Sequence, residues 1–107
     1  MEKRYSQFSE HELRQEITHL NDKAKKAEQM GMVNELAVYE RKIVMAKSYL
    51  LNPDDFQPGE SYELNDGEGT IFKISYMNGI FAWGHRQGNE NREEEAFPIA
   101  LLVNKMN

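Results

Sequence analysis

Three histidines are the side chains of this chain whose type most readily suggests metal or proton chemistry. His11 and His19 lie eight residues apart in a segment with helical periodicity. Along a helix this spacing separates them by about 12 Å, so they cannot ligate one ion together. The segment around His11 also lacks the second histidine of a zinc-protease helix. His85 falls near the end of an apolar β segment, where we expect a partly buried, hydrogen-bonded histidine.

Carboxylates occur in two short runs, Asp54-Asp55 and Glu93-Glu94-Glu95. Consecutive carboxylates on a loop point in different directions, and neither run has the spacing of a calcium-binding loop. The chain has no cysteine, which excludes disulfides and thiolate zinc sites. No glycine-rich loop precedes a helix, and no serine has a recognisable catalytic partner. The sequence therefore predicts a protein that is not an enzyme and that needs no metal or cofactor.

Charge is distributed unevenly along the chain, whose net charge is −5. Residues 1–52 hold nine Lys and Arg against eight Asp and Glu, whereas residues 53–107 hold four against ten. Binding to a nucleic-acid backbone depends on cationic side chains, so a nucleic-acid partner would meet the first half. No stretch reaches the roughly 20 apolar residues of a membrane span, and the charged start MEKRYSQFSE differs from a secretory signal. We expect a cytoplasmic protein without a membrane partner.

The strongest polar signal is a set of cations in the first half: Lys23, Lys25 and Lys26, followed by Arg41, Lys42 and Lys47. Lys25 and Lys26 fall near the C-terminus of an expected helix, where the macrodipole favours cations, and this accounts for part of the pattern. The other explanation is an anionic surface: nucleic acid, an acidic protein, or the chain's own loop 88–95. The candidate partner-binding residues are Lys23, Lys25, Lys26, Arg41, Lys42, Glu93, Glu94 and Glu95.

The first element that positions these side chains is a helix. Ser9 and Glu12 have the spacing of a capping box, with Phe8 and Leu13 at the positions of a hydrophobic staple. A narrow apolar stripe follows at spacings of four and three residues: Leu13, Ile17, Leu20, Ala24 and Ala27. Gly31 is the expected stop, because the residue just after a helix often needs a positive φ.

A second helix, capped by Asn34 and ended by Asn52-Pro53, is expected to run antiparallel to the first. It carries two neighbouring apolar stripes, Leu36, Tyr39, Ile43, Ala46 and Leu50 in one and Val33, Ala37, Val44 and Leu51 in the other. So wide an apolar surface needs two partners, and we expect this helix to lie between the first helix and the rest of the chain. Met45 and Tyr49 lie outside both stripes, either as surface residues or as part of a subunit contact.

The later part of the chain alternates between apolar and polar residues and predicts four strands: Ser61–Leu64, Thr70–Met77, Ile80–Arg86 and Ala96–Val103. Asn78-Gly79 suggests a two-residue type I′ turn, which pairs Tyr76 with Phe81. One face of this hairpin would then carry Phe72, Ile74, Tyr76, Phe81, Trp83 and His85. The strands predict a small, strongly bent barrel.

The aromatic rings of this hairpin have two explanations. In so short a domain they are needed for the barrel interior, so we expect them to form core. A stacking platform for nucleic-acid bases is the alternative, and it requires Tyr76 or Trp83 on an exposed face beside Lys or Arg. Gly84 is expected to mark a bulge or a close approach of two backbones.

Several runs of the chain resemble the YfhH family of small bacterial proteins: MEKRYSQ, ELRQEI, KAKKAEQMGMVNE, AVYERKIVMAKSYLLNPDDF and NGIFAWG. The resemblance covers nearly the whole chain and implies a helical hairpin followed by an SH3-like β-barrel. The family has no established functional residues, so none is carried over. Its occasional label of transcriptional regulator rests on likeness of fold.

Together these patterns predict an α+β protein in which an N-terminal antiparallel helical hairpin (1–52) packs on a C-terminal SH3-like β-barrel (53–107) as one cooperative unit. We expect a non-enzymatic interaction module that binds a protein or peptide partner. The alternative is a transcriptional regulator that binds nucleic acid through the basic side of the hairpin. The sequence leaves the oligomeric state open.

Overall fold

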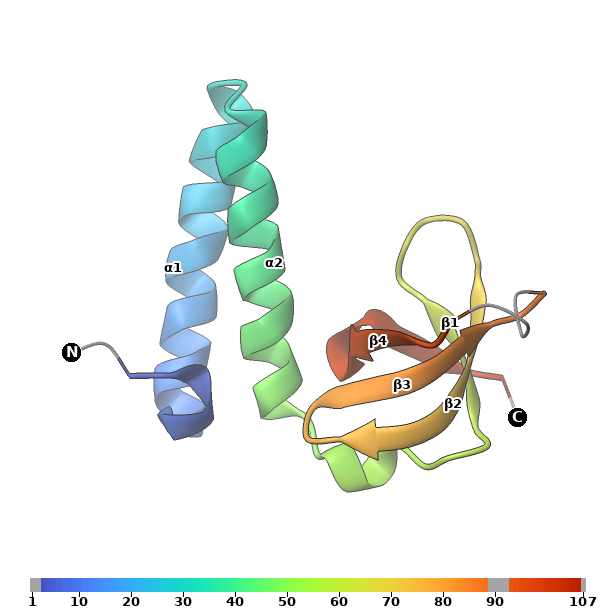
Figure 1. The fold of residues 1–107 in the computed structure, drawn as a ribbon. Helices are drawn as coiled ribbons and strands as arrows, with labels where there is room; N and C mark the ends of the chain where they lie inside the picture. The colour runs from blue at the N-terminus through green and yellow to red at the C-terminus, as the bar shows by residue number, and fades with distance from the viewer. Residues whose placement is uncertain (1–2, 89–92, 107) are drawn as a thin grey trace. The chain divides into compact units, whose positions relative to one another are not determined.

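A computed structural model describes residues 3–88 and 93–106 and divides the chain after Leu50 into two compact units. The first unit holds η1 (Tyr5–Gln7), α1 (Glu10–Gln29) and α2 (Val33–Leu50), where η marks a 3-10 helix (Figure 1). The second unit holds η2 (Pro53–Asp55), β1 (Ser61–Leu64), β2 (Ile71–Asn78), β3 (Phe81–Arg86), β4 (Glu95–Pro98), η3 (Ile99–Leu101) and β5 (Leu102–Lys105). The fold is therefore α+β, with a helical hairpin followed by an antiparallel sheet.

α1 begins and ends through the local signals that the sequence predicts. The Ser9 hydroxyl accepts the Glu12 N–H at 3.1 Å, and the Glu12 carboxylate accepts the Ser9 N–H at 2.9 Å. This confirms the capping box. Gly31 has a φ of 70°, which confirms the predicted stop. The apolar stripe is buried at Leu13, Leu20, Ala24 and Ala27 and half-buried at Ile17.

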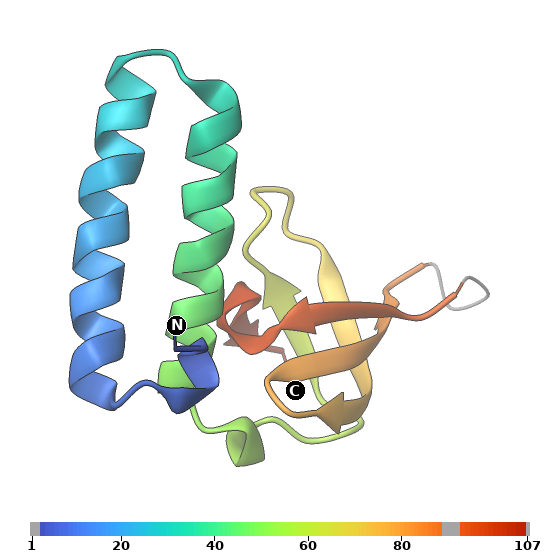
Figure 2. The ribbon, with the colours of Figure 1, turned by 60° about the vertical axis from the view of Figure 1, so that its left-hand side comes forward.

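α2 runs antiparallel beside α1 (Figures 1 and 2). A shared core of Leu20, Ala24 and Ile43 joins the two helices, with Ile17, Leu36 and Tyr39 packed against it. α2 starts at Val33, so the prediction that Asn34 caps it is wrong. Within the described residues, neither helix has the length and apolar character that crossing a bilayer requires. The packing of α2 on the sheet stays a prediction.

The sheet has five antiparallel strands in the order β4-β3-β2-β1-β5, and it curls rather than lying flat (Figure 2). Its two outer strands are consecutive in the sequence and are joined by η3. The prediction of one strand over Ala96–Val103 is wrong, because η3 interrupts it after Pro98. Pro98 has no N–H to give to a ladder, and the next residue, Ile99, is fully buried. The chain therefore turns inward at this point.

The β2–β3 hairpin turns one residue later than the sequence predicts. Asn78 pairs with Phe81, so Gly79 and Ile80 form the turn. The predicted type I′ turn is wrong, because it needs a positive φ at Asn78, and among the described residues only glycines have one. Ile80 is buried in this turn, with 7% of its surface exposed, and this burial favours the observed register.

A β-bulge at Ser75 then changes which residues share a face. Ile74 pairs with Gly84 and Tyr76 pairs with Trp83, so Ser75 has no residue opposite it. Ile74 is buried, whereas Tyr76 lies on the other face, 44% exposed, with its ring stacked on Trp83. The prediction that the rings of the hairpin form core is therefore wrong for Tyr76.

Gly84 confirms the predicted close approach of two backbones. A Cβ atom at this position would overlap the carbonyl oxygen of Lys73 and lie 3.1 Å from the backbone nitrogen of Ser75. Only a residue without a side chain lets the two strands meet in this way beside the bulge. The buried residues of this unit include Tyr62, Leu64, Phe72, Ile74, Ala82, Ile99 and Leu102.

Candidate partner-binding site

A groove of about 670 Å³ lies on the helical unit, where η1 meets α1 and α2. We call it the hairpin groove and define it by its lining residues: Lys3, Arg4, Tyr5, Phe8, Glu12, Glu16, His19, Leu20, Lys23, Tyr39 and Lys42. It brings together Lys3 and Arg4, which precede η1, with Lys23 of α1 and Lys42 of α2. Three aromatic rings lie among them.

Polar contacts hold η1 and the residues just before it against α1. The Tyr5 hydroxyl donates to the Glu16 carboxylate at 2.9 Å, and the Lys3 ammonium lies 3.1 Å from the Glu12 carboxylate. The Tyr5 ring also meets the Phe8 ring edge to face, with 5.3 Å between centroids. These contacts hold the segment that carries Lys3 against the helices, and this segment forms one wall of the groove.

The two carboxylates of the hairpin groove are both engaged. The backbone N–H of Ser9, and then the Lys3 ammonium, hold the pKa of Glu12 below its ordinary value. Glu12 therefore stays ionised to lower pH than a free glutamate. Glu16 accepts the Tyr5 hydroxyl. Neither carboxylate forms an ion pair with the cations on the opposite side of the groove, within the described residues.

Three cations of the groove remain available for a ligand. No ion pair joins Arg4, Lys23 or Lys42 to any residue that the structure describes. The Lys23 ammonium lies 5.9 Å from the centroid of the Tyr39 ring, a cation–π distance that orients it without neutralising its charge. An acidic ligand would thus meet three positive charges beside apolar rings.

A second, mostly apolar surface of about 400 Å³ adjoins the hairpin groove, and the two share Tyr5 and Lys42. We call it the α2 surface; it is lined by Tyr5, Val38, Arg41, Lys42, Met45 and Tyr49. Val38, Arg41, Met45 and Tyr49 follow one side of α2 at helical spacing. Met45 and Tyr49, which fit neither predicted stripe, therefore form an accessible surface rather than part of the helix–helix core.

The structure separates the cations that the sequence grouped together. Lys23 and Lys42 line the hairpin groove, and Arg41 lines the α2 surface. Lys25 and Lys26 are exposed on α1 and line neither surface. Their place near the end of α1 fits the macrodipole explanation.

The acidic candidates lie in the second unit. Glu93 and Glu94 are exposed, and Glu95, the first residue of β4, forms an ion pair with Arg86 at 2.7 Å. Residues 89–92 of the predicted loop lie outside the described residues. Within residues 3–88 and 93–106, no three His, Asp or Glu side chains are grouped so that they could hold a metal ion.

Sequence reasoning missed two cations of the groove, Lys3 and Arg4. They precede α1 and belong to no periodic pattern, so nothing in the sequence relates them to Lys23 or Lys42. The signal that could have found them is the aromatic pair Tyr5 and Phe8, whose apolar rings require a neighbour close to the start of α1.

Two comparisons with known proteins extend over nearly the whole chain. Residues 3–103 match the model of a family described as "Protein of unknown function (DUF1811)". The chain belongs to this family. It is also similar to the uncharacterized protein YfhH of Bacillus subtilis (strain 168), with 58% identity over 105 residues that cover 98% of this chain and 99% of that protein.

Proposed function

We propose that this member of the DUF1811 family is a non-enzymatic interaction module that binds an acidic segment of a partner protein at the hairpin groove. The observation that carries the proposal is the gathering of Arg4, Lys23 and Lys42, none of which has an ion-pair partner among the described residues. Charges of one sign in a concave surface favour a ligand of the opposite sign.

Two features support a protein segment as the ligand. The α2 surface continues the groove with apolar side chains, Val38, Met45 and Tyr49, which suit the apolar anchors of a peptide. Methionine adapts its shape to a bound side chain. A segment with carboxylates and an apolar residue would bind both surfaces, the carboxylates in the hairpin groove and the apolar residue on the α2 surface.

The runner-up is a transcriptional regulator that binds nucleic acid through the basic side of the hairpin. Lys3, Arg4, Lys23, Arg41 and Lys42 all line the two adjoining surfaces and support it. Two facts favour the protein partner over it. The groove contains two carboxylates, and the chain as a whole has a net charge of −5; both oppose a polyanion with a charge on every nucleotide more than a short segment with a few carboxylates.

Affinity capture from a Bacillus subtilis lysate, with and without nuclease, separates these functions. We expect the immobilised chain to retain the same partner protein after nuclease treatment. If nuclease treatment removed all captured protein and binding fell steeply with salt, the runner-up would be the better explanation. Cell fractionation with a tagged chain tests the cytoplasmic location that we propose for this activity.

We further propose that the sheet is an SH3-like barrel. The two outer strands, β4 and β5, follow each other in the sequence and are linked by a 3-10 turn, which favours an arrangement that brings them around the core. Nuclear Overhauser contacts between β4 and β5 are the expected result, and their absence would leave an open, curled sheet.

A further inference from the structure

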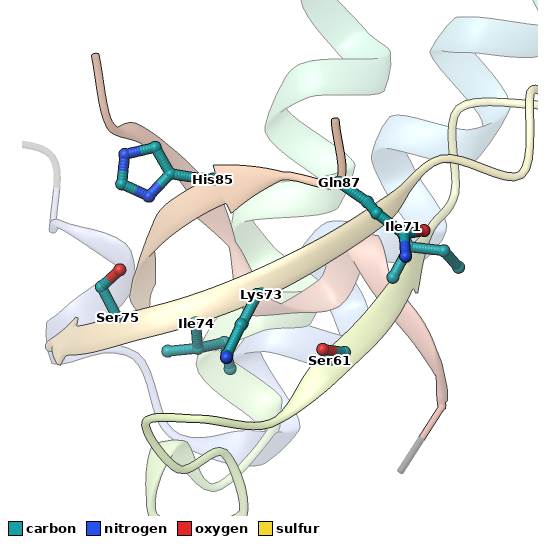
Figure 3. Close-up of a pocket in the computed structure, with 7 residues that line it drawn as sticks. All are labelled: Ser61, Ile71, Lys73, Ile74, Ser75, His85 and Gln87. Atoms are coloured by element: carbon teal, nitrogen blue, oxygen red, sulfur yellow. The ribbon is translucent and has the colours of Figure 1, made fainter. Parts of the chain in front are cut away.

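The sheet carries a hollow of about 300 Å³, lined in part by the apolar side chains of Ile71 and Ile74 (Figure 3). We call it the sheet hollow. Its polar lining is Ser61, Lys73, Ser75, His85 and Gln87. It lies in the strand-rich unit and shares no residue with the hairpin groove, so it needs an explanation of its own.

The centre of the sheet hollow is a row of three side chains across three strands. Lys73 on β2 pairs with Ser61 on β1 and with His85 on β3, so the three share one face (Figure 3). No ion pair joins the exposed Lys73 to another described residue. On this face the ammonium of Lys73 and a ring N–H of His85 are donors of the kind that a phosphate group accepts from.

A pair of stacked rings adjoins this row on the same face. The rings of Tyr76 and Trp83 lie 5.8 Å apart between centroids, at an interplanar angle of 6°. Trp83 is two residues before His85 on β3, which places the two side chains next to each other on the strand. Tyr76 is 44% exposed, and Trp83 covers only one face of its ring.

We propose that this face of the sheet binds a nucleoside monophosphate, with its phosphate at Lys73 in the sheet hollow and its base stacked on Tyr76. A base has a planar π-face that extends an aromatic stack, and its phosphate provides the negative charge that Lys73 lacks among the described residues. The Ser75 bulge creates the site, because it turns Tyr76 out of the core and onto the face that carries Lys73.

A free nucleotide fits this face better than a nucleic-acid strand. Residues 53–107 hold ten Asp and Glu against four Lys and Arg. Their field opposes a chain of phosphates far more than it opposes a single one. This site is independent of the hairpin groove, and either can fail without affecting the other.

Fluorescence of Trp83 reports on the site directly, because it is the chain's only tryptophan. Titration with adenosine monophosphate should change this fluorescence in a saturable way. Inorganic phosphate alone should change it little, and adenosine alone should bind at least about tenfold more weakly, since it lacks the charged contact. A single-stranded oligonucleotide that binds more tightly than the mononucleotide would overturn the free nucleotide as the ligand.

Lys73→Glu should weaken the binding of adenosine monophosphate at least about tenfold. Lys25→Glu is the matched control, because it makes the same charge change at an exposed lysine of the other unit, and its titration should equal that of the wild type. Tyr76→Leu keeps an apolar side chain but removes the ring, and should also weaken binding. No saturable signal in the wild type, or equal affinities of the wild type and Lys73→Glu, would overturn the proposal. Circular dichroism of each variant confirms that it is folded.

Discussion

Single residues decide how the sheet bends, and Gly84 is the clearest example. Ser75 is the extra residue of the bulge, and Gly84 lies where β3 passes closest to it. The constraint is steric rather than conformational, because Gly84 is the one glycine of the described residues without a positive φ. Gly79, in contrast, has open space around it and a φ of 61°.

Gly84→Ala should therefore destabilise the strand-rich unit by about 3 kcal/mol or more, since the backbone of Lys73 cannot move aside without breaking the ladder. Gly79→Ala should cost only about 1 kcal/mol, because it adds conformational strain without an overlap. Urea unfolding followed by Trp83 fluorescence measures both. If Gly84→Ala lowered the free energy of unfolding less than Gly79→Ala does, the backbones of Gly84 and Lys73 would not be in close contact.

Tyr62 gives the sheet a dependence on alkaline pH. Burial first, and then its hydrogen bond to the Glu60 carboxylate at 3.1 Å, raise the pKa of Tyr62 to about 12. The unfolded chain loses this proton near pH 10 and the folded chain only near pH 12. Between these values the folded state binds more protons, so the stability that Tyr62 contributes is present below pH 10 and falls as pH rises.

In the variant Tyr62→Phe, stability should depend less on pH in this range. We expect the free energy of unfolding of the wild type to decrease more steeply between pH 10 and pH 12 than that of the variant. The other tyrosines and the lysines titrate in both proteins, so the difference between the two curves isolates Tyr62. Parallel curves over this window would contradict the raised pKa.

At the scale of elements, the helices follow local signals. The reciprocal hydrogen bonds of Ser9 and Glu12 start α1, and Gly31 ends it. Because each signal acts through neighbouring backbone groups, it could be recognised from the sequence alone. β1 could also be recognised from the sequence alone, and its bounds Ser61–Leu64 are those predicted.

Ser9→Ala should lower the stability of the helical unit by about 1 kcal/mol, because the N–H of Glu12 loses its acceptor. Thermal unfolding followed by the helical circular dichroism signal measures the change. Ser6→Ala is the control. Ser6 is exposed in η1, so this substitution should change the free energy of unfolding by no more than about 0.5 kcal/mol. Equal effects of the two substitutions would mean that the cap contributes nothing.

Other elements could not be predicted, because they depend on contacts between distant segments. The bulge at Ser75 depends on the approach of Gly84, and the η3 turn depends on the burial of Ile99. An Asn-Gly pair favours one turn locally, but burial of Ile80 outweighs that preference. For the same reason the sequence identified Lys23 and Lys42 as candidates but not the groove that joins them to Arg4.

At the scale of the whole molecule, the two units carry different kinds of surface. The helical unit presents a cationic groove with an apolar continuation, and the strand-rich unit presents a small polar hollow beside stacked rings. We propose that the charge of the hairpin groove, rather than the positive charge of the helices in general, selects the partner.

Quantitative capture with two charge-reversed variants tests whether the charge of the groove selects the partner. Lys23→Glu with Lys42→Glu changes the hairpin groove, and Lys25→Glu with Lys26→Glu makes the same change of charge on exposed positions outside it. With the immobilised chain held well below the Kd of the wild type, we predict that the groove variant retains at least about tenfold less partner protein than nuclease-treated wild type, because its affinity falls at least about tenfold. The control variant should retain most of it. Equal recovery of the partner with the two variants would contradict a role of the groove charge in binding.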